Sequence, residues 1–326
     1  MDPLKQINTY TNLQKALVHS VIAGGTASMR YYRQPLSELS TESSSKNPST
    51  IADLHATLAI IYALDNYLSP ITMNQFGCDF SCLAEETHYR QWFQNKLSAP
   101  LFQKIRTPTQ FFSQTKGIRV IIDGIDGTGN FLRGIPLFCS AAALIIDNHP
   151  RISALYDPVH HLVYSALLPG PDNNICQNAE AWEWHISNNH RTDLMRLNQD
   201  HEKKPLLKET IGIHFTRSDP DKVHELVHAE NSHSIVEKLS RASAGIYAFN
   251  SSFIAMIYVA QAALGAYINN TTHLWDIAAG EVLVRACGGK VTDLNKNPIV
   301  YNTSSRVSVV AARASLYDDL MRILFI

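Results

Sequence analysis

Two aspartates follow an apolar run in the segment GIRVIIDGID, residues 117–126. Asp123 and Asp126 stand where such a strand must turn, and ligands of open α/β sheets commonly bind at strand ends. Two neighbouring carboxylates repel each other, so they need a metal ion, a basic partner or a shared proton. Carboxylate and carbonyl oxygens suit hard cations such as Mg²⁺, which often also bind a substrate phosphate. The pair indicates a metal site, while two simple turn acids remain the alternative.

A glycine-containing turn directly follows these acids. Gly127, Thr128 and Gly129 precede the residues NFL, where we expect a helix to begin. Backbone N–H groups in such a turn at a helix N-terminus bind phosphate oxygens well. The pattern does not match a calcium-binding loop, which needs acids at alternate positions and a distal glutamate. Metal ligands and an anion cradle are therefore adjacent in the sequence, a combination more specific than either feature alone.

Two further acidic positions could complete the site. Glu85 and Glu86 are adjacent in CLAEETHYR. Because neighbouring side chains point in different directions, we expect at most one of them to bind a metal directly. Asp276 follows Trp275 in THLWDIAAG, ahead of small residues that suit a tightly packed helix. Each of these acids, taken alone, also fits a solvated acid or a helix N-cap.

The elements that must position these residues mix helices and strands. Helical spacing is found at residues 3–32 and 51–68, with a polar, serine-rich loop at 37–50 between them. Strands are predicted at 117–126, 138–147, within 151–168, at 307–312 and at 323–326. Later helices are predicted at 221–239, at 253–268 as one buried core helix, and from about residue 276. The predicted fold class is α/β, an α+β layered sandwich in which helices and sheets alternate.

Composition limits the cellular context and the partners. The 326 residues fit a single domain, or two closely packed halves of about 1–165 and 166–326. The 28 Lys and Arg nearly balance the 29 Asp and Glu, which argues against a nucleic-acid polymer as the main partner. Five irregularly spaced cysteines favour free thiols in a reducing compartment. Since neither a signal peptide nor a membrane span is recognised, we expect a cytoplasmic protein without a membrane partner.

Three motifs, in order, resemble the signatures of the inositol monophosphatase family, which belongs to a superfamily of lithium-sensitive, Mg²⁺-dependent phosphatases. They are AEET at 84–87, DGIDGTGNFLRGIP at 123–136 and WDIAAGEVLVRACGGKVTD at 275–293. PSTIADLHA at 48–56 is similar to the family's upstream element, and NSSFIAMIYVAQAALGAYI at 250–268 to its core helix. The resemblance implies a layered sugar-phosphatase fold and a phosphoric monoester hydrolase that acts on a small phosphorylated metabolite.

The resemblance also implies two or three bound Mg²⁺ ions. Glu85, Asp123 and the backbone carbonyl of Ile125 would hold the first ion. Asp123, Asp126 and Asp276 would hold the second, with Asp123 bridging the two. A third, weaker ion would lie near Glu85 and the serine-rich loop. Two metals roughly 3.5–4 Å apart clamp both the attacking and the leaving oxygen of an in-line displacement.

The same resemblance assigns the remaining roles. Thr128 would work with Asp53 to orient and deprotonate the attacking water, so that no covalent enzyme intermediate is needed. The catalytic residues implied are Asp53, Thr128 and Glu85, and those implied to contact substrate are Gly127, Thr128, Ser252 and Asn269. For Ser252, a capping role at the start of the following helix remains an alternative. His273 either touches substrate or packs against Trp275.

This chain departs from the family pattern at several positions. Gly124 replaces a proline that stiffens the metal-binding turn, and Ala84 replaces a glycine. Asn269 replaces a glutamate that binds ring hydroxyls in inositol phosphatases. The usual lysine of the loop before Asp53 has Lys46 as its nearest candidate. The missing charge at Asn269 weakens the case for inositol monophosphate itself, and the expected substrate is an inositol-phosphate-like compound or a sugar phosphate.

The alternatives follow from these departures. Within the superfamily, a nucleotide 3′-phosphatase acting on adenosine bisphosphate or a fructose bisphosphatase would use the same catalytic residues. A protein of another class would bind metal and a phosphorylated ligand without catalysis. Because family members are often homodimers, the resemblance also includes a homodimer among the expected assemblies.

Overall fold

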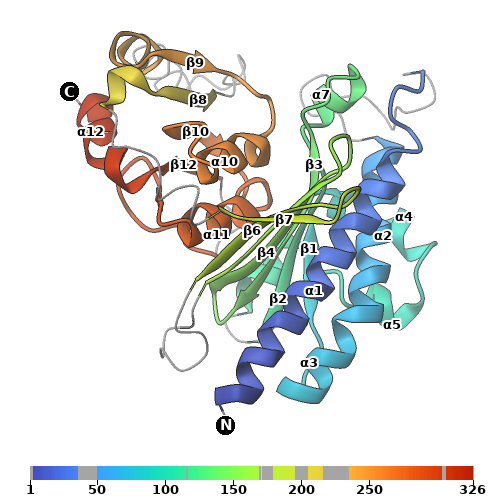
Figure 1. The fold of residues 1–326 in the computed structure, drawn as a ribbon. Coiled ribbons are helices and arrows are strands. Elements are labelled where there is room, and N and C mark those ends of the chain that lie inside the picture. Colours follow the sequence, from blue (N-terminus) through green and yellow to red (C-terminus); the bar gives the residue numbers. More distant parts are fainter. Residues whose placement is uncertain are drawn as a thin grey trace.

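The computed structural model describes residues 3–35, 50–114, 117–168, 170, 179–194, 205–215, 235–302 and 306–325. Within these residues, two β-sheets alternate with layers of helices, as Figure 1 shows. The predicted α/β class, an α+β layered sandwich, is therefore confirmed. The larger sheet is built from residues 81–193 and the smaller one from residues 210–312. A division into two closely packed halves stays a prediction.

The larger sheet has the strand order β1-β2-β3-β4-β5-β6-β7. Its strands are β1 (Ser81–Ala84), β2 (Ile118–Asp126), β3 (Cys139–Ile146), β4 (His149–Asp157), β5 (Leu162–Leu167), β6 (Glu180–His185) and β7 (His190–Asp193). Strand β1 is parallel to β2, and the later neighbours are antiparallel. The carboxyl ends of β1 and β2 therefore lie together at one edge of the sheet.

The smaller sheet has the order β11-β12-β10-β8-β9. Its strands are β8 (Thr210–His214), β9 (Gly245–Tyr247), β10 (Ala266–Thr272), β11 (Lys290–Thr292) and β12 (Val307–Ala312). Strands β9 and β10 both pair in parallel with β8, whereas β12 is antiparallel to β10 and β11. The carboxyl ends of β8, β9 and β10 therefore meet at a single edge of this sheet.

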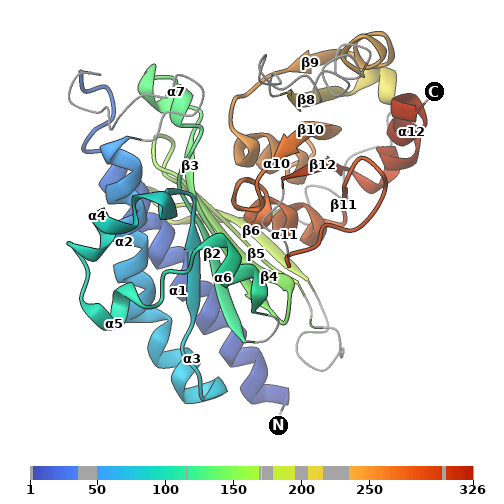
Figure 2. The same cartoon turned by 180° about the vertical axis from the view of Figure 1, so that it is seen from behind.

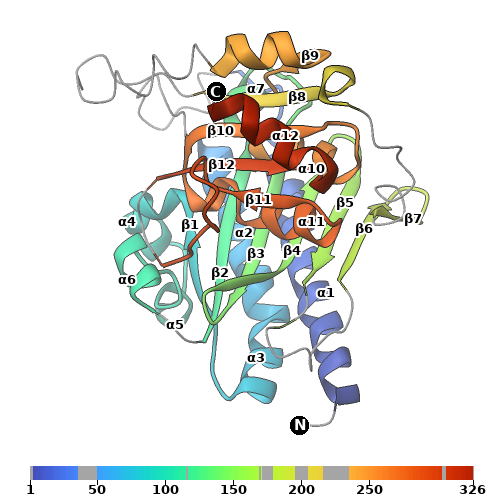
Figure 3. The ribbon, with the colours of Figure 1, turned by 90° about the vertical axis from the view of Figure 1, so that its left-hand side faces the viewer.

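Helices α1 (Pro3–Ser28) and α2 (Ile51–Tyr67) cover one face of the larger sheet, and α3 (Ser69–Phe76) follows α2 (Figures 1 and 2). Helix α2 begins at a capping box. The Thr50 side chain accepts hydrogen bonds from the backbone N–H groups of Ala52 and Asp53, and the Asp53 carboxylate accepts one from the backbone N–H of Thr50. The apolar side chains of α1, α2 and the sheet form one continuous core cluster. Short helices α4 (Arg90–Gln94), α5 (Ala99–Phe102) and α6 (Pro108–Ser113) lie beside β1 (Figure 3).

Helices α10 (Ser252–Ala260) and α11 (Ala278–Ala286) fill the space between the two sheets, where the largest apolar cluster lies. Helix α12 (Ala314–Phe325) packs on the other face of the smaller sheet, as Figure 3 shows. Helix α7 (Thr128–Leu132) follows β2. The 3₁₀ turns are η2 (Glu85–Tyr89), η3 (Leu206–Lys208) and η5 (Leu274–Asp276).

The prediction of one core helix over residues 253–268 was wrong. Helix α10 ends at Ala260, the chain turns through Ala262 in the left-handed region at φ 59°, and strand β10 begins at Ala266. Strand β10 is apolar at the start because Ala266 to Ile268 are buried between helices on both faces of the sheet. A buried strand of this kind has the same continuous apolar pattern as a buried helix.

The predicted strand at residues 323–326 was also wrong, because residues 323–325 belong to helix α12. Tyr317, Leu320 and Leu324 recur at a helical spacing and all belong to the cluster under the smaller sheet. Ile326 lies outside the described residues, as do residues 37–49 of the predicted serine-rich loop and residues 221–234 of the predicted helix. Residues 235–242 are helical, which confirms the described end of that helix, residues 235–239.

Two other expectations concern the whole chain. Four described cysteines, Cys78, Cys82, Cys139 and Cys287, are free thiols, as predicted. In the part of the chain that the structure describes, no helix combines the length and apolar character needed to cross a membrane.

Candidate active site

Three acidic residues from distant parts of the chain meet beside the carboxyl ends of β1 and β2. Glu85 opens η2 directly after β1, and Asp123 lies near the end of β2. Because Ala84 pairs with Ile122 in the parallel ladder, the two following residues are brought to the same edge. Asp276 comes from η5, which follows β10. One carboxylate oxygen of each acid lies within 4.8 Å of the others.

A β-bulge in β2 sets the directions of the Asp123 and Asp126 side chains. Asp123 pairs with Ala141 and Asp126 with Cys139, so β2 has one more residue than β3 over this interval. Ser140 Oγ, opposite the bulge, donates to the carbonyl oxygen of Gly124 at 2.6 Å. Ile125 is buried in a small apolar cluster with Ala52, Ala56, Phe131 and Phe138. The bulge therefore separates the directions of the two aspartates while the Ile125 side chain anchors the turn.

The carboxylate of Asp123 is buried without a partner. Both of its oxygens are inaccessible, and neither has a hydrogen bond among the described residues. Burial, followed by the charges of Glu85 and Asp126, raises the pKa of Asp123 well above its usual value. A buried carboxylate that lacks hydrogen bonds is costly unless a cation neutralises it. The oxygen-only group of Glu85, Asp123 and Asp276 therefore fits a divalent metal ion.

Asp126 lies next to this group, and α10 holds its carboxylate. It accepts hydrogen bonds from Ser251 Oγ, from the backbone N–H of Ser252 at 3.2 Å and from that of Phe253 at 2.8 Å. These bonds stabilise an anion at the start of α10. Burial outweighs them and raises the pKa of Asp126 to about 7. Asp126 therefore ties the larger sheet to α10, and the structure leaves it outside the three-acid group.

Asp53 and Thr128 meet although 75 residues separate them. Thr128 Oγ1 lies 2.9 Å from Asp53 Oδ1 and also 2.9 Å from the carbonyl oxygen of Ile125. The other oxygen of Asp53 accepts from the backbone N–H of Thr50 at 2.7 Å. Burial raises the pKa of Asp53 to about 6, although the bonds from Thr50 and Thr128 oppose the shift. Asp53 is thus fixed in orientation and remains mostly ionised at neutral pH.

The adjacent glutamates point to different surroundings. Glu85 joins the three-acid group, whereas Glu86 is fully buried beside α2. Thr57 Oγ1 donates to Glu86 Oε2 at 2.7 Å, and Glu86 Oε1 has no partner among the described residues. Burial, followed by the charge of Asp53, raises the pKa of Glu86 to about 8. The Thr57–Glu86 contact has no local sequence signal, because its partners are 29 positions apart.

The glycine turn after Asp126 opens α7. Gly127 has a φ of 89°, a left-handed conformation that favours glycine, and its carbonyl accepts from the N–H groups of Asn130 and Phe131. A side chain at Gly127 would come within 2.9 Å of the carbonyl oxygen of Leu137. The turn can therefore exist in this form only with glycine at position 127.

Ser252 on α10 and Asn269 on β10 were both expected to contact substrate. Both are buried, and both side chains hydrogen-bond to the hydroxyl of Tyr267. Ser252 Oγ lies 2.9 Å from Tyr267 Oη. Asn269 Nδ2 donates to the same hydroxyl at 3.2 Å, and Asn269 Oδ1 accepts from the N–H of Thr271 at 3.1 Å. Both side chains of the pair have low exposure. Much of the hydrogen-bonding capacity of Asn269 is therefore used inside the protein.

Sequence reasoning missed His214, which ends β8 and pairs in register with Asn269. Its Nδ1 is buried and has no hydrogen-bond partner among the described residues, as is also true of His273 Nδ1 and Trp275 Nε1. Burial lowers the pKa of His214, with the charge of Asp276 acting in the opposite direction. The rings of His273 and Trp275 stack with centroids 4.1 Å apart. Ring nitrogens without hydrogen-bond partners among the described residues thus lie near Asp276.

The buried acids predict how the metal-free protein responds to pH. Asp53, Asp126 and Glu86 have folded-state pKa values of about 6, 7 and 8, above their usual values of 3.8, 3.8 and 4.5. Because the folded state binds more protons, their stabilising contribution is complete below about pH 4 and is lost as the pH rises through these folded values.

A bound divalent cation should offset that loss. We expect Mg²⁺ to raise the melting temperature more at pH 8 than at pH 5, relative to the same protein in a chelator. Circular dichroism melts at both pH values, with and without Mg²⁺, measure the difference. An equal gain at the two pH values would contradict a metal bound by the carboxylates of the three-acid group, Glu85, Asp123 and Asp276.

Comparison with known proteins identifies the family. The profile described as "Inositol monophosphatase family" matches residues 10–324. A probable inositol 1-monophosphatase, ImpA of Mycobacterium tuberculosis, is 30% identical over 206 residues, which cover 63% of this chain and 66% of that protein. A bifunctional NADP phosphatase/NAD kinase of Methanococcus maripaludis is 27% identical over 222 residues, 63% of this chain and 35% of that protein. The chain thus spans less than two thirds of the length of these relatives.

A solved structure supports the fold over nearly the whole chain. The extragenic suppressor protein suhB of Bartonella henselae superposes with a TM-score of 0.68 at 20% identity, covering 96% of this chain and 98% of that one. Since the family profile also matches nearly the whole chain, the protein is a member of the inositol monophosphatase family.

Proposed function

We propose that this protein is a Mg²⁺-dependent phosphomonoesterase that hydrolyses a small phosphorylated metabolite by means of an activated water. The observation that carries the proposal is Asp123, which lies beside Glu85 and Asp276 and whose two buried oxygens lack hydrogen-bond partners among the described residues. A buried carboxylate in this state needs a cation. Family membership supports the phosphatase activity, and lithium inhibition, a homodimer and a cytoplasmic location accompany the proposal on the basis of the family resemblance.

Specific residues would hold the metals. Glu85, Asp123 and the carbonyl of Ile125 are proposed for the first ion, and Asp123, Asp126 and Asp276 for the second. Asp126 keeps acceptor capacity beyond its bonds to α10, because an ionised carboxylate has about four lone-pair positions. When bound, Mg²⁺ would polarise the phosphoryl group and neutralise charge on the leaving oxygen. The loop proposed to approach a third ion lies outside the described residues.

The Asp53–Thr128 pair would activate the water. Thr128 Oγ1 lies 2.9 Å from Asp53 Oδ1, so a water that donates to Thr128 could pass a proton through this hydroxyl to the carboxylate. The water oxygen then forms the new bond to phosphorus as the bond to the alcohol oxygen breaks. The backbone N–H groups of Gly127 and Thr128 would orient the phosphate. The chain's own residues thereby supply a base, an orienting hydroxyl and an anion cradle.

A sugar-like or inositol-like alcohol is the first candidate for the other half of the substrate. The neutral groups on the smaller sheet, Asn269 and His214, can exchange hydrogen bonds with hydroxyl groups. Because Asn269 is largely bonded internally, the unpartnered nitrogen of His214 is the stronger candidate for this contact. Position 269 has no acidic side chain that could accept hydrogen bonds from ring hydroxyls.

A nucleotide is the second candidate, and an aromatic pair favours it. Tyr247 ends β9 at the same sheet edge as His214, and its side chain is 54% exposed. Its ring stacks on Phe249 with centroids 5.7 Å apart and an interplanar angle of 20°. One face of Tyr247 could therefore receive a base. The relative named as an NADP phosphatase is compatible with such a substrate.

Phosphate release from a panel of substrates tests the proposal. We expect Mg²⁺-dependent hydrolysis of at least one member among inositol phosphates, sugar phosphates, adenosine bisphosphate and histidinol phosphate. The activity should disappear in a chelator and fall in millimolar Li⁺. Hydrolysis that survives complete chelation would refute the metal mechanism. If no substrate turns over at saturating Mg²⁺, the alternative of a metal- and phosphate-binding protein without catalysis replaces it.

A further inference from the structure

A cavity of about 460 Å³ lies at the far end of β1 and β2 from the three-acid group. It is lined by Cys78, Asp79, Phe80, Ser81, Pro100, Gln103, Lys104, Arg106, Gln114, Gly117 and Ile118. Ile118 begins β2, five residues before Asp123, which corresponds to about 16 Å along the strand. The cavity is therefore separate from the candidate active site.

Two cations enter this cavity from one short segment. Residues 104–106 run beside β1, where Cys82 donates to the carbonyl of Lys104 at 2.9 Å and Arg106 donates to the carbonyl of Cys82 at 2.8 Å. Side chains alternate along an extended segment. Ile105 is buried in the core, so Lys104 and Arg106 both project to the opposite side, where they line the cavity.

The two cations differ in their partners. The ammonium of Lys104 lies 2.6 Å from Asp65, 2.6 Å from Asp79 and 2.5 Å from Ser69 Oγ, which uses its three donors. The side chain of Arg106, by contrast, makes no hydrogen bond or ion pair within the described ranges. Its Nε is buried and unpartnered. A buried donor without an acceptor costs about 1–3 kcal/mol, and more when it is charged.

The surrounding groups favour an anion at Arg106. Gln114 Oε1 accepts from Ser81 Oγ at 2.7 Å, which turns the amide so that its NH₂ group remains available as a donor. Of the two lining cations, Lys104 is neutralised by Asp65 and Asp79, so Arg106 is the one without an ion pair among the described residues. The volume falls in the range of about 300–1,000 Å³ that is typical of small-molecule sites.

We propose that this cavity binds a small anionic metabolite through an oxyanion group, with the Arg106 guanidinium as the main contact and the Gln114 amide as a second donor. A planar guanidinium matches phosphate and carboxylate oxygens in a bidentate geometry. Such a ligand would satisfy Arg106 Nε. The proposal is independent of the phosphatase activity, because it uses none of the residues assigned to catalysis.

Titration calorimetry on the full-length protein in a chelator tests the proposal, with inorganic phosphate and succinate as separate probes. Without metal, the acids of the candidate active site repel anions, so saturable binding reports another site. We expect saturable binding of at least one probe by the unmodified protein, and at least about tenfold weaker binding by Arg106→Gln. The two probes distinguish a phosphate ligand from a carboxylate ligand.

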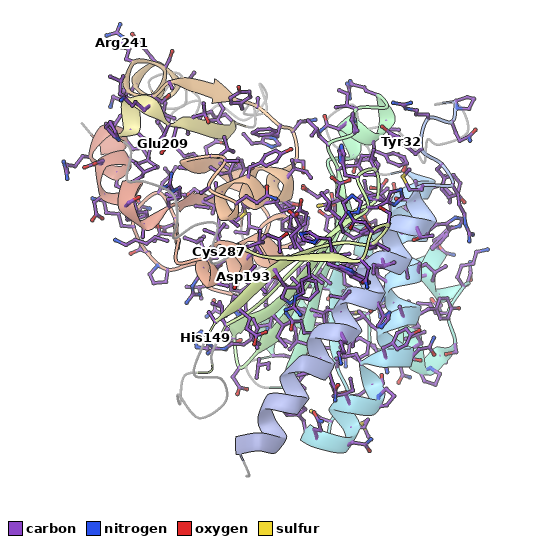
Figure 4. The ribbon with its side chains drawn as sticks, in the orientation of Figure 1. Tyr32, His149, Asp193, Glu209, Arg241 and Cys287 are labelled. Atoms are coloured by element: carbon purple, nitrogen blue, oxygen red, sulfur yellow. The ribbon has the colours of Figure 1, made fainter. Side chains whose placement is uncertain are left out.

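Arg241→Gln is the matched control. Among the described residues, Arg241 pairs with the exposed Glu237, and Figure 4 shows it at the outer edge of the molecule, pointing away from the rest of the structure. This variant should bind the probe as the unmodified protein does. If Arg106→Gln fails to fold, Arg106→Lys replaces it. We expect severalfold weaker binding by this variant, because lysine keeps the charge but loses the bidentate contact of the guanidinium. Absence of saturable binding, or equal affinity in the Arg106 and Arg241 variants, would overturn the proposal.

Discussion

Asp53→Asn should lower kcat by about 10²–10⁴-fold, the usual contribution of a positioned general base. The amide has nearly the same shape as the carboxylate and can still accept from Thr128, but it cannot take up a proton. One oxygen of Asp53 also accepts from Thr50, so we expect a modest loss of helix capping, about 1 kcal/mol. Steady-state kinetics well below the melting temperature separate the catalytic effect from this loss.

Asp65→Asn provides the control for this experiment. Asp65 lies in the same helix α2, but it contacts Lys104 rather than the candidate active site. This variant should keep its activity within about twofold, since surface substitutions usually change stability by less than about 0.5 kcal/mol. The Mg²⁺-induced rise in melting temperature should persist in both variants. If Asp53→Asn retained nearly full activity, the base would have to be sought elsewhere.

The acidic group could be predicted from sequence because its members stand at strand ends and match a known pattern. Glu85 follows β1 and Asp123 ends an apolar strand, and the parallel pairing of β1 with β2 then brings them together. Asp276 could be singled out locally as a candidate acid, but only the motif assigned it to the same site, because nothing local to it indicates a contact with residues more than 150 positions away. The parallel pairing of β1 with β2 therefore explains why Glu85 and Asp123 meet, whereas the order of the motifs is what adds Asp276 to them.

Contacts between distant elements escaped sequence reasoning. The bond between Ser251 and Asp126 joins residues 125 positions apart, and it assigns to Asp126 a role in holding α10 that no local pattern indicates. The fold errors have a related cause. Strand β10 was predicted as helix because burial on both faces removes the alternation that marks most strands. Both the Ser251–Asp126 bond and strand β10 therefore depend on packing between residues that are far apart in the sequence.

Gly124→Ala should destabilise the protein by about 1–3 kcal/mol, the usual cost of forcing extra atoms into a packed region. A side-chain carbon at this position would lie 2.5 Å from Thr57 Oγ1 and 2.9 Å from the carbonyl oxygen of Asp53. The glycine that replaces the family's proline is therefore required by the close approach of α2. We also expect activity to fall by up to about 10²-fold, because the proposed metal ligand Asp123 and the proposed base Asp53 would be displaced.

Chemical denaturation and kinetics of four proteins test this explanation: the unmodified chain, Gly124→Ala, Thr57→Ala and the double variant. Removing Thr57 Oγ1 opens space for the new carbon, so the double variant should lose less stability than the sum of the two single changes. Gly245→Ala is the control, because a carbon there would meet Thr210 at an ordinary 3.7 Å. Additive effects of the two substitutions would show that Thr57 does not require the glycine. Because Thr57 also donates to Glu86, the coupling measures how closely this turn, α2 and the glutamate pair depend on one another.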